Sequence, residues 1–363
     1  MLVYYSPRAV VNEENLKLPG MARFSIFFKI YNMRMMLIDR TDTIKIPIRV
    51  KSLFPLPPFK KSPKTLEDIC NERALELLQR AERLGVLIYV FWSGGIDSTL
   101  VLVSLLKNAT DSQKKNIVVL LSEASIIEDP QFFQRYIRGK LRTESSIFFQ
   151  GKVGGRDLIT NGELGDQVFG SNISSQALMK MFDNSIIHRP YSRDILFQFY
   201  NLKIDNEEMT NFYLDIFDRL MKASPIPIRT YFEYFWWLIF NLEWQGVFMR
   251  VLQFTPDQNA LGVTTEYFHT NLNPFFGTEE FQLWSLNNPD KRIKDAWNTF
   301  KWPAKDIICD FTGDKEYNRT KSKQNSFSIW QQRTKPFNFM DEEMRLFRGM
   351  RLESYFESDN SFL

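Results

Sequence analysis

The sequence contains little cysteine and little histidine. Its 363 residues include two cysteines, Cys70 and Cys309, and two histidines, His188 and His269. This excludes a disulfide scaffold, a four-cysteine zinc site and a cysteine-held iron–sulfur cluster, and it leaves little room for a histidine-rich metal site. The 46 basic and 43 acidic residues leave a net charge of +3. That charge is not the strongly basic balance typical of proteins that bind nucleic acid.

Long hydrophobic runs are also missing. Residues 1–5 lack the basic stretch followed by an apolar one that marks a secretory signal peptide. The most apolar run, residues 234–240, is flanked by Glu233 and Asn241 and is far shorter than the ~20 residues that cross a bilayer. We therefore interpret this run as a buried helix, and we expect a cytoplasmic protein with no membrane partner.

Aromatic residues are abundant, at 15% of the chain with 33 Phe. Together with 44% hydrophobic and 25% charged residues, this composition predicts a folded chain with a large core. Apolar and alternating segments predict strands at residues 24–31, 36–38 and 43–50, and four prolines in residues 53–63 predict an extended connector. We expect a small strand-rich N-terminal segment over residues 1–60, a main domain over residues 61–340 and a C-terminal helix or tail over residues 341–363.

Helical and strand-like segments alternate after the connector. Thr65 and Asp68 match a capping box at the start of a helix that Gly85 would end. The expected elements are a helix at 65–84, a strand at 86–91, a helix at 99–107, and strands at 116–121 and 157–160. This order predicts an α/β fold with a parallel sheet and helices on both of its faces. A mainly helical C-terminal half follows, with its longest helical stretch at residues 229–254.

A glycine-containing loop, Ser-Gly-Gly-Ile-Asp-Ser at residues 93–98, lies between the first buried strand and the next helix. Gly94 and Gly95 carry no side chains, so backbone N–H groups can approach an anion closely. The helix N-terminus adds the positive end of its dipole, and Ser93 and Ser98 add hydroxyl donors. Asp97 suits a phosphate site when Mg²⁺ bridges its carboxylate to phosphate oxygens.

This loop resembles the PP-loop of the N-type ATP pyrophosphatases, a superfamily that includes asparagine synthetase, β-lactam synthetase, GMP and NAD synthetases and tRNA-modifying enzymes. It differs from a Walker loop, which needs Gly-Lys followed by Ser or Thr. The resemblance implies an adenine nucleotide alpha-hydrolase-like fold that binds ATP and Mg²⁺ at residues 93–98. It also implies adenine contacts at the end of the second strand, for which Leu121 and Ser122 are the candidates.

Residues 158–170 carry a second motif, which resembles the Gly-Glu-Gly-Ser-Asp-Glu-Leu-Phe-Gly segment of the asparagine synthetase C-terminal domain. The matching residues are Gly162, Glu163, Asp166, Phe169 and Gly170.

The second motif implies specific roles for three of its residues. Gly162 would belong to the ATP site, Asp166 would hold Mg²⁺ together with Asp97, and Glu163 would act in acyl transfer. Parallel strands also bring their carboxyl ends to one edge of a sheet, which is where ligands bind in open α/β sheets. The two aspartates are therefore expected to converge.

This second motif departs from the family pattern at Leu164, Gly165 and Gln167, and these departures bear on the substrate more than on the ATP site. A basic segment at residues 319–327 resembles the loop in which asparagine synthetases carry a lysine that stabilises charge during adenylation. Spacing leaves both Lys321 and Lys323 as candidates for that lysine.

The family resemblance extends loosely from residue 65 to residue 327. Glutamine-dependent asparagine synthetases begin with a glutaminase domain that has a cysteine at position two, where this chain has Leu2. Residues 1–60 are too few for that domain, so we expect no glutamine hydrolysis and a separate source of ammonia or amine. A reduced remnant of such a domain is one hypothesis for residues 1–60.

These patterns predict an ATP-dependent, AMP-forming carbon–nitrogen ligase. It would adenylate an oxygen of a small carboxylate or amino-acid substrate, release pyrophosphate and pass the acyl group to ammonia or an amine. Glu163 would act as general base, and Lys321 or Lys323 would stabilise charge. Two alternatives stay open: a PP-loop enzyme that modifies a nucleobase or tRNA, favoured by the basic loop, and an inactive nucleotide-binding protein, favoured by Gln167.

Overall fold

The computed structural model describes residues 1–30, 36–146, 149, 155–252, 264–321, 339–347 and 352–356. The chain forms two compact units. Unit 1 comprises Met1–Phe59, Gly170–Gln253 and Phe337–Leu363, and unit 2 comprises Lys60–Phe169 and Phe254–Pro336. The first change of unit, between Phe59 and Lys60, falls inside the proline-rich connector.

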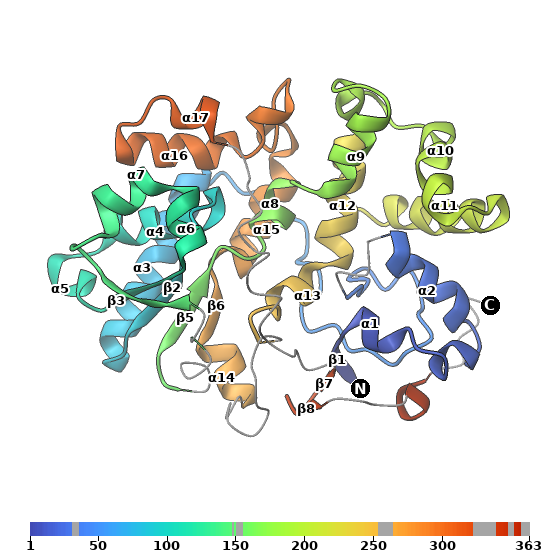
Figure 1. Cartoon of the computed structure of the whole chain (residues 1–363), viewed down its shortest axis with the longest axis horizontal. Coiled ribbons are helices and arrows are strands. Elements are labelled where there is room, and N and C mark those ends of the chain that lie inside the picture. Colours follow the sequence, from blue (N-terminus) through green and yellow to red (C-terminus); the bar gives the residue numbers. More distant parts are fainter. Residues whose placement is uncertain are drawn as a thin grey trace. The chain divides into compact units, whose positions relative to one another are not determined.

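A parallel sheet organises unit 2 (Figure 1). In the described part of the chain its strand order is β4-β3-β2-β5-β6, and each neighbouring pair runs parallel. The strands are β2 (Ile88–Phe91), β3 (Ile117–Leu121), β4 (Arg142–Ser145), β5 (Leu158–Asn161) and β6 (Leu272–Pro274). The parallel α/β sheet expected from the sequence is thus confirmed, with its central strands at the predicted places. The sequence did not reveal β4 or β6, because β4 is short and polar and β6 is a three-residue strand that contains Pro274.

Helices surround this sheet. α3 (Leu66–Leu84) begins with the predicted capping box between Thr65 and Asp68 and ends at Gly85, whose backbone is left-handed. α3 packs against α4 (Ile96–Asn108), and both contact β2. The other helices of unit 2 are α5 (Asp111–Lys114), α6 (Glu123–Glu128), α7 (Pro130–Phe132), α8 (Gly165–Phe169), α14 (Thr265–Thr270), α15 (Glu279–Asn287), α16 (Trp302–Thr312) and α17 (Tyr317–Thr320).

Unit 1 contains a helix where the sequence predicted a strand. Residues 24–30 belong to α2 (Met21–Ile30), whereas Tyr31 lies outside the described residues. Phe24, Phe27 and Phe28 are buried at helical spacing, and the Phe27 ring stacks on the ring of Tyr213 with centroids 5.4 Å apart. The prediction of a strand was wrong because a short apolar run does not by itself distinguish a strand from a buried helix.

The other predicted N-terminal strands are also largely absent from the described residues. Residues 36–38 form no strand, and residues 43–50 contribute only isolated bridges, Leu2 to Val50 and Ile48 to Phe356. The described part of residues 1–60 is therefore not strand-rich. Pro47 lacks the backbone N–H that a regular ladder needs, which accounts in part for the difference.

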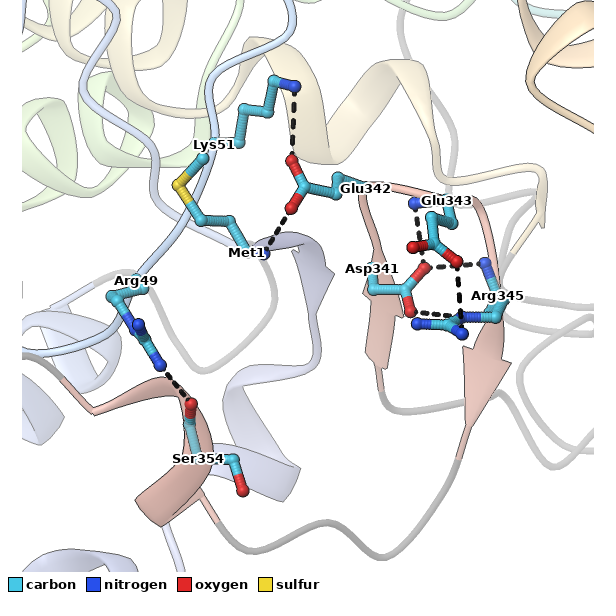
Figure 2. Close-up of polar contacts among 8 residues, drawn as sticks. All are labelled: Met1, Arg49, Lys51, Asp341, Glu342, Glu343, Arg345 and Ser354. Carbon is cyan, nitrogen blue, oxygen red and sulfur yellow. Dashed lines mark hydrogen bonds and ion pairs between the residues drawn. The ribbon is translucent and has the colours of Figure 1, made fainter.

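A small antiparallel sheet in unit 1 joins segments from distant parts of the chain. Within the described residues its order is β1-β7-β8, with β1 (Leu2–Tyr5), β7 (Phe339–Asp341) and β8 (Leu346–Phe347). Figure 2 shows Glu342 accepting hydrogen bonds from the Met1 ammonium at 2.9 Å and from Lys51 at 3.3 Å. Exposed ion pairs of this kind contribute little stability, so backbone pairing is the main link. Where a C-terminal helix or tail was predicted over residues 341–363, the described residues form the end of β7, the strand β8 and the short 3₁₀ helix Leu352–Tyr355.

The remaining α-helices of unit 1 are α1 (Pro7–Val10), α9 (Ile173–Met181), α10 (Arg193–Ile204), α11 (Glu207–Lys222), α12 (Tyr231–Leu242) and α13 (Trp244–Phe248). Aromatic rings of α10, α11 and α12 pack together in its core. α12 carries the apolar run and is almost wholly buried, as predicted. The single helical stretch predicted at residues 229–254 is instead divided at Glu243 into α12 and α13. None of the helices in the described ranges combines the length and apolarity that crossing a membrane requires.

Candidate functional site

The glycine loop lies in unit 2 between β2 and the N-terminus of α4. Gly94 has φ +77°, a left-handed conformation that glycine adopts without strain. A Cβ atom at Gly94 would lie 2.5 Å from the Ser125 carbonyl oxygen and 2.9 Å from Glu128 Cβ. Position 94 therefore requires glycine for two reasons: its backbone is left-handed, and α6 leaves no room for a side chain.

The two serines of the loop hydrogen bond to the loop itself. The Ser93 N–H donates to Ser98 Oγ at 3.0 Å, and the Ser98 hydroxyl donates to the Gly95 carbonyl at 3.1 Å. The Ser93 and Ser98 hydroxyl oxygens are also 3.0 Å apart. In this structure the serines, which were predicted as ligand donors, hold the loop in shape at the start of α4.

The second motif packs directly against the first. A Cβ atom at Gly165 would lie 2.6 Å from Asp97 Oδ1, and one at Gly162 would lie 2.7 Å from the Ser98 backbone nitrogen. Leu164 has φ +71°, a left-handed angle that suits the glycine found at this position in the family pattern. The two motifs predicted to cooperate therefore meet, and two glycines without side chains allow the contact.

The side chain of Lys301 lies between the two predicted metal ligands. Its Nζ atom is 2.5 Å from Asp97 Oδ2 and 2.6 Å from Asp166 Oδ1. The Lys301 side chain is 2% exposed, whereas those of Asp97 and Asp166 are 20% and 29% exposed. The two carboxylates therefore converge on one point, as the sequence predicted, and that point holds an ammonium group of the chain itself.

Sequence reasoning missed Lys301. It is the N-cap residue of α16, with a left-handed backbone (φ 57°, ψ 26°), and its N–H donates to the Arg292 carbonyl at 3.0 Å. Pro303 in the first turn of α16 is the one local signal, since proline favours helix starts. That signal marks a helix boundary and does not indicate that the preceding lysine reaches two aspartates.

The charge state of Lys301 follows from its surroundings. Burial by itself lowers the pKa of an ammonium group, but the adjacent carboxylates of Asp166 and Asp97 outweigh that effect and raise the pKa of Lys301 above its ordinary value. Lys301 is therefore a permanent cation at neutral pH. One turn later, burial and the Lys301 charge lower the pKa of Lys305 to about 8.

The side chains of Asp97 and Asp166 suit a magnesium ion that enters the site bound to a nucleotide. Mg²⁺ is commonly held by one or two carboxylates together with substrate phosphates and water, and Asp97 and Asp166 supply two converging carboxylates. Within the described ranges no group of three or more His, Cys, Asp or Glu side chains is placed to hold a metal ion. Two converging carboxylates suit a metal that shares its coordination with phosphate.

Lys321 lies near α6. Its Nζ atom donates to the Glu128 carbonyl at 2.9 Å and lies 3.5 Å from Asp129 Oδ2. Glu128 also lies beside the glycine loop, where a Cβ at Gly95 would be 3.4 Å from Glu128 Oε1. Lys323, the other candidate, lies outside the described residues.

The remaining predicted residues lie at the carboxyl edge of the sheet or next to it. Glu163 is partly buried in the turn between β5 and α8, where its N–H donates to Asn161 Oδ1 at 3.1 Å. Leu121 ends β3, and Ser122 caps α6 by accepting a hydrogen bond from the Ser125 N–H. In the structure the Ser122 hydroxyl thus serves the start of α6.

No protein-family model matches the chain, and no curated protein matches its sequence.

Proposed function

We propose that the protein is an ATP-dependent, AMP-forming carbon–nitrogen ligase of the asparagine synthetase-like PP-loop type, with an adenine nucleotide alpha-hydrolase-like domain. One observation carries the proposal. Asp97 and Asp166 come from two separate motifs that resemble the same family, and their carboxylate oxygens lie 2.5 and 2.6 Å from one nitrogen atom. Ligands bind at this edge of open α/β sheets.

The loop and the first turn of α4 would bind the phosphates of ATP. Backbone N–H groups at the start of a helix attract anions, and the 13-residue α4 begins directly after Gly95. Mg²⁺ held by Asp97 and Asp166 would supply neutralisation of charge on the leaving pyrophosphate. The ammonium of Lys301 would add a second positive charge beside the metal.

The substrate is proposed to be a small carboxylate or amino acid. Its carboxylate oxygen would attack the α-phosphorus while the bond to pyrophosphate breaks, and an ammonia or amine nitrogen would then displace AMP from the acyl carbon. Glu163, in the turn between β5 and α8, is proposed to accept the proton that this nitrogen loses. Lys321 and Lys323 remain the candidates for stabilising charge from the basic segment.

The test is the release of AMP and pyrophosphate from labelled ATP with a panel of carboxylates and amines. We expect Asp97→Asn and Asp166→Asn each to abolish release. The matched control is Asp111→Asn, which removes a carboxylate that is 98% exposed in the same unit and is expected to keep wild-type activity. Equal release by wild type and Asp97→Asn would show that the site is wrongly assigned.

A second candidate function is nucleotide binding without catalysis. The observation that favours it is Gln167, a buried residue that stands where the asparagine synthetase segment has a second glutamate. Calorimetry showing ATP binding, with no AMP released on any substrate, would support this alternative. RNA that co-purifies and dissociates steeply with salt would instead favour the tRNA-modifying branch.

A further inference from the structure

The cation between Asp97 and Asp166 belongs to the chain and lies outside both motifs. Lys301 reaches the pair from the N-cap of α16, more than a hundred residues after Asp166 in the sequence. Its Nζ atom contacts one oxygen of each carboxylate. A divalent ion bound by the same two oxygens would lie about 2.0–2.1 Å from each of them. That position overlaps the place that the ammonium occupies.

The backbone keeps the Lys301 ammonium close to this place. The Lys301 N–H donates to the Arg292 carbonyl, and its own carbonyl accepts the Lys305 N–H at 3.0 Å. The side chain is buried, with Nζ 5.9 Å from the centre of the Phe169 ring. The burial of the side chain and the hydrogen bonds of its backbone thus hold the ammonium at the two carboxylates.

The net charge of Asp97, Asp166 and Lys301 determines under which conditions a metal ion can bind between them. With Lys301 alone the two carboxylates leave one net negative charge, and adding a divalent ion turns the buried site net positive. Repulsion between the ammonium and a nearby divalent ion is strong even at an effective dielectric constant of about 20. Phosphates of a nucleotide would remove this excess and would give the displaced ammonium a new partner.

We infer that Lys301 is an internal counter-cation that excludes free divalent metal from the Asp97–Asp166 pair, so that metal binds there only together with a polyphosphate. Lys301 is thus a residue that sets the order and specificity of ligand binding. The inference rests on the proposed nucleotide site and deepens it. It concerns binding alone and needs no turnover.

The experiment titrates the full-length protein with Mn²⁺, followed by electron paramagnetic resonance, without nucleotide. Lys301→Met removes the charge at similar length and is expected to bind Mn²⁺ at least about tenfold more tightly than wild type. The double variant Lys301→Met with Asp166→Asn is expected to lose that gain. Lys107→Met, which removes an exposed lysine paired with Glu67 on the same unit, is the matched control and should behave as wild type.

A Lys301→Met protein that binds Mn²⁺ no more tightly than wild type overturns the inference. Lys301→Arg keeps the charge and is expected to exclude Mn²⁺ as wild type does, which separates charge from shape. Circular dichroism verifies that each variant is folded. If Lys301→Met does not fold, the test uses wild type alone, and its Mn²⁺ affinity is measured with and without α,β-methylene ATP. Equal affinity in the two conditions also overturns the inference.

The outcomes are distinguishable from failure of the proposed function. A gain of Mn²⁺ affinity in Lys301→Met with no AMP released by wild type would support the inference and reject the ligase. AMP release that depends on Asp97, with no gain in Lys301→Met, would do the reverse.

Discussion

Gly165→Ala places a methyl group where the Asp97 carboxylate already lies. The new Cβ would be 2.6 Å from Oδ1 and 2.9 Å from Oδ2 of Asp97, whereas ordinary van der Waals contact begins near 3.4 Å. Asp97 cannot move freely, because it is in the first turn of α4 and is paired with Lys301. Such overpacking costs about 1–3 kcal/mol of stability.

The larger effect is expected on the chemistry. Displacement of a reacting group by on the order of 1 Å lowers a rate about 100-fold, so the proposed AMP formation should fall by roughly that factor in Gly165→Ala. Urea denaturation measures the loss of stability, and release of AMP from labelled ATP measures the loss of activity.

Gly85→Ala is the matched control for this prediction. Gly85 has φ +64° and no neighbour within 4 Å of an added Cβ, so alanine there costs about 1–2 kcal/mol through the backbone alone. AMP formation by this control should remain at the wild-type level. A Gly165→Ala protein with wild-type stability and wild-type AMP formation would refute the packing of the two motifs described above.

Three further predictions concern stability, each measured by urea denaturation. Thr65→Ala removes the capping box of α3 and should lower the free energy of unfolding by about 1 kcal/mol; an unchanged midpoint would contradict the cap. Phe27→Ala opens the stack on Tyr213 and should cost about 3–5 kcal/mol, whereas a strand with Phe27 at the surface predicts almost no change. The pKa of Lys305 in the folded protein is lowered to about 8. Below that pH Lys305 is charged in the folded state, and its burial there reduces the free energy of unfolding. Wild type should therefore gain stability relative to Lys305→Met as the pH rises from 8 to about 10.4; a difference independent of pH would argue against the lowered pKa.

Much of the site could be predicted from the sequence because it depends on short-range signals. The capping box at Thr65, the stop at Gly85 and the strand beginning at Ile88 are local patterns with local physical causes. The convergence of Asp97 and Asp166 also followed from local patterns, since both aspartates come shortly after parallel strands that share one sheet edge.

The predictions that failed depended on partners that are distant in sequence. The apolar run at residues 24–30 became the helix α2 through packing against Tyr213, almost two hundred residues away. The short strand β6 pairs with β5 although its own residues carry almost no strand signal. In both cases a segment distant in sequence buries the residues, and this burial determines whether they form a helix or a strand.

By itself the sequence determined the strand–loop–helix unit, the placement of two acidic residues at one edge of a parallel sheet and the glycines beside them. These features follow from backbone sterics and from the spacing of apolar residues. The tertiary structure alone decided which cation lies between the carboxylates. Lys301 reaches them because α16 packs on α4, and a lysine's spacing in the sequence carries no information about which buried charge it will meet.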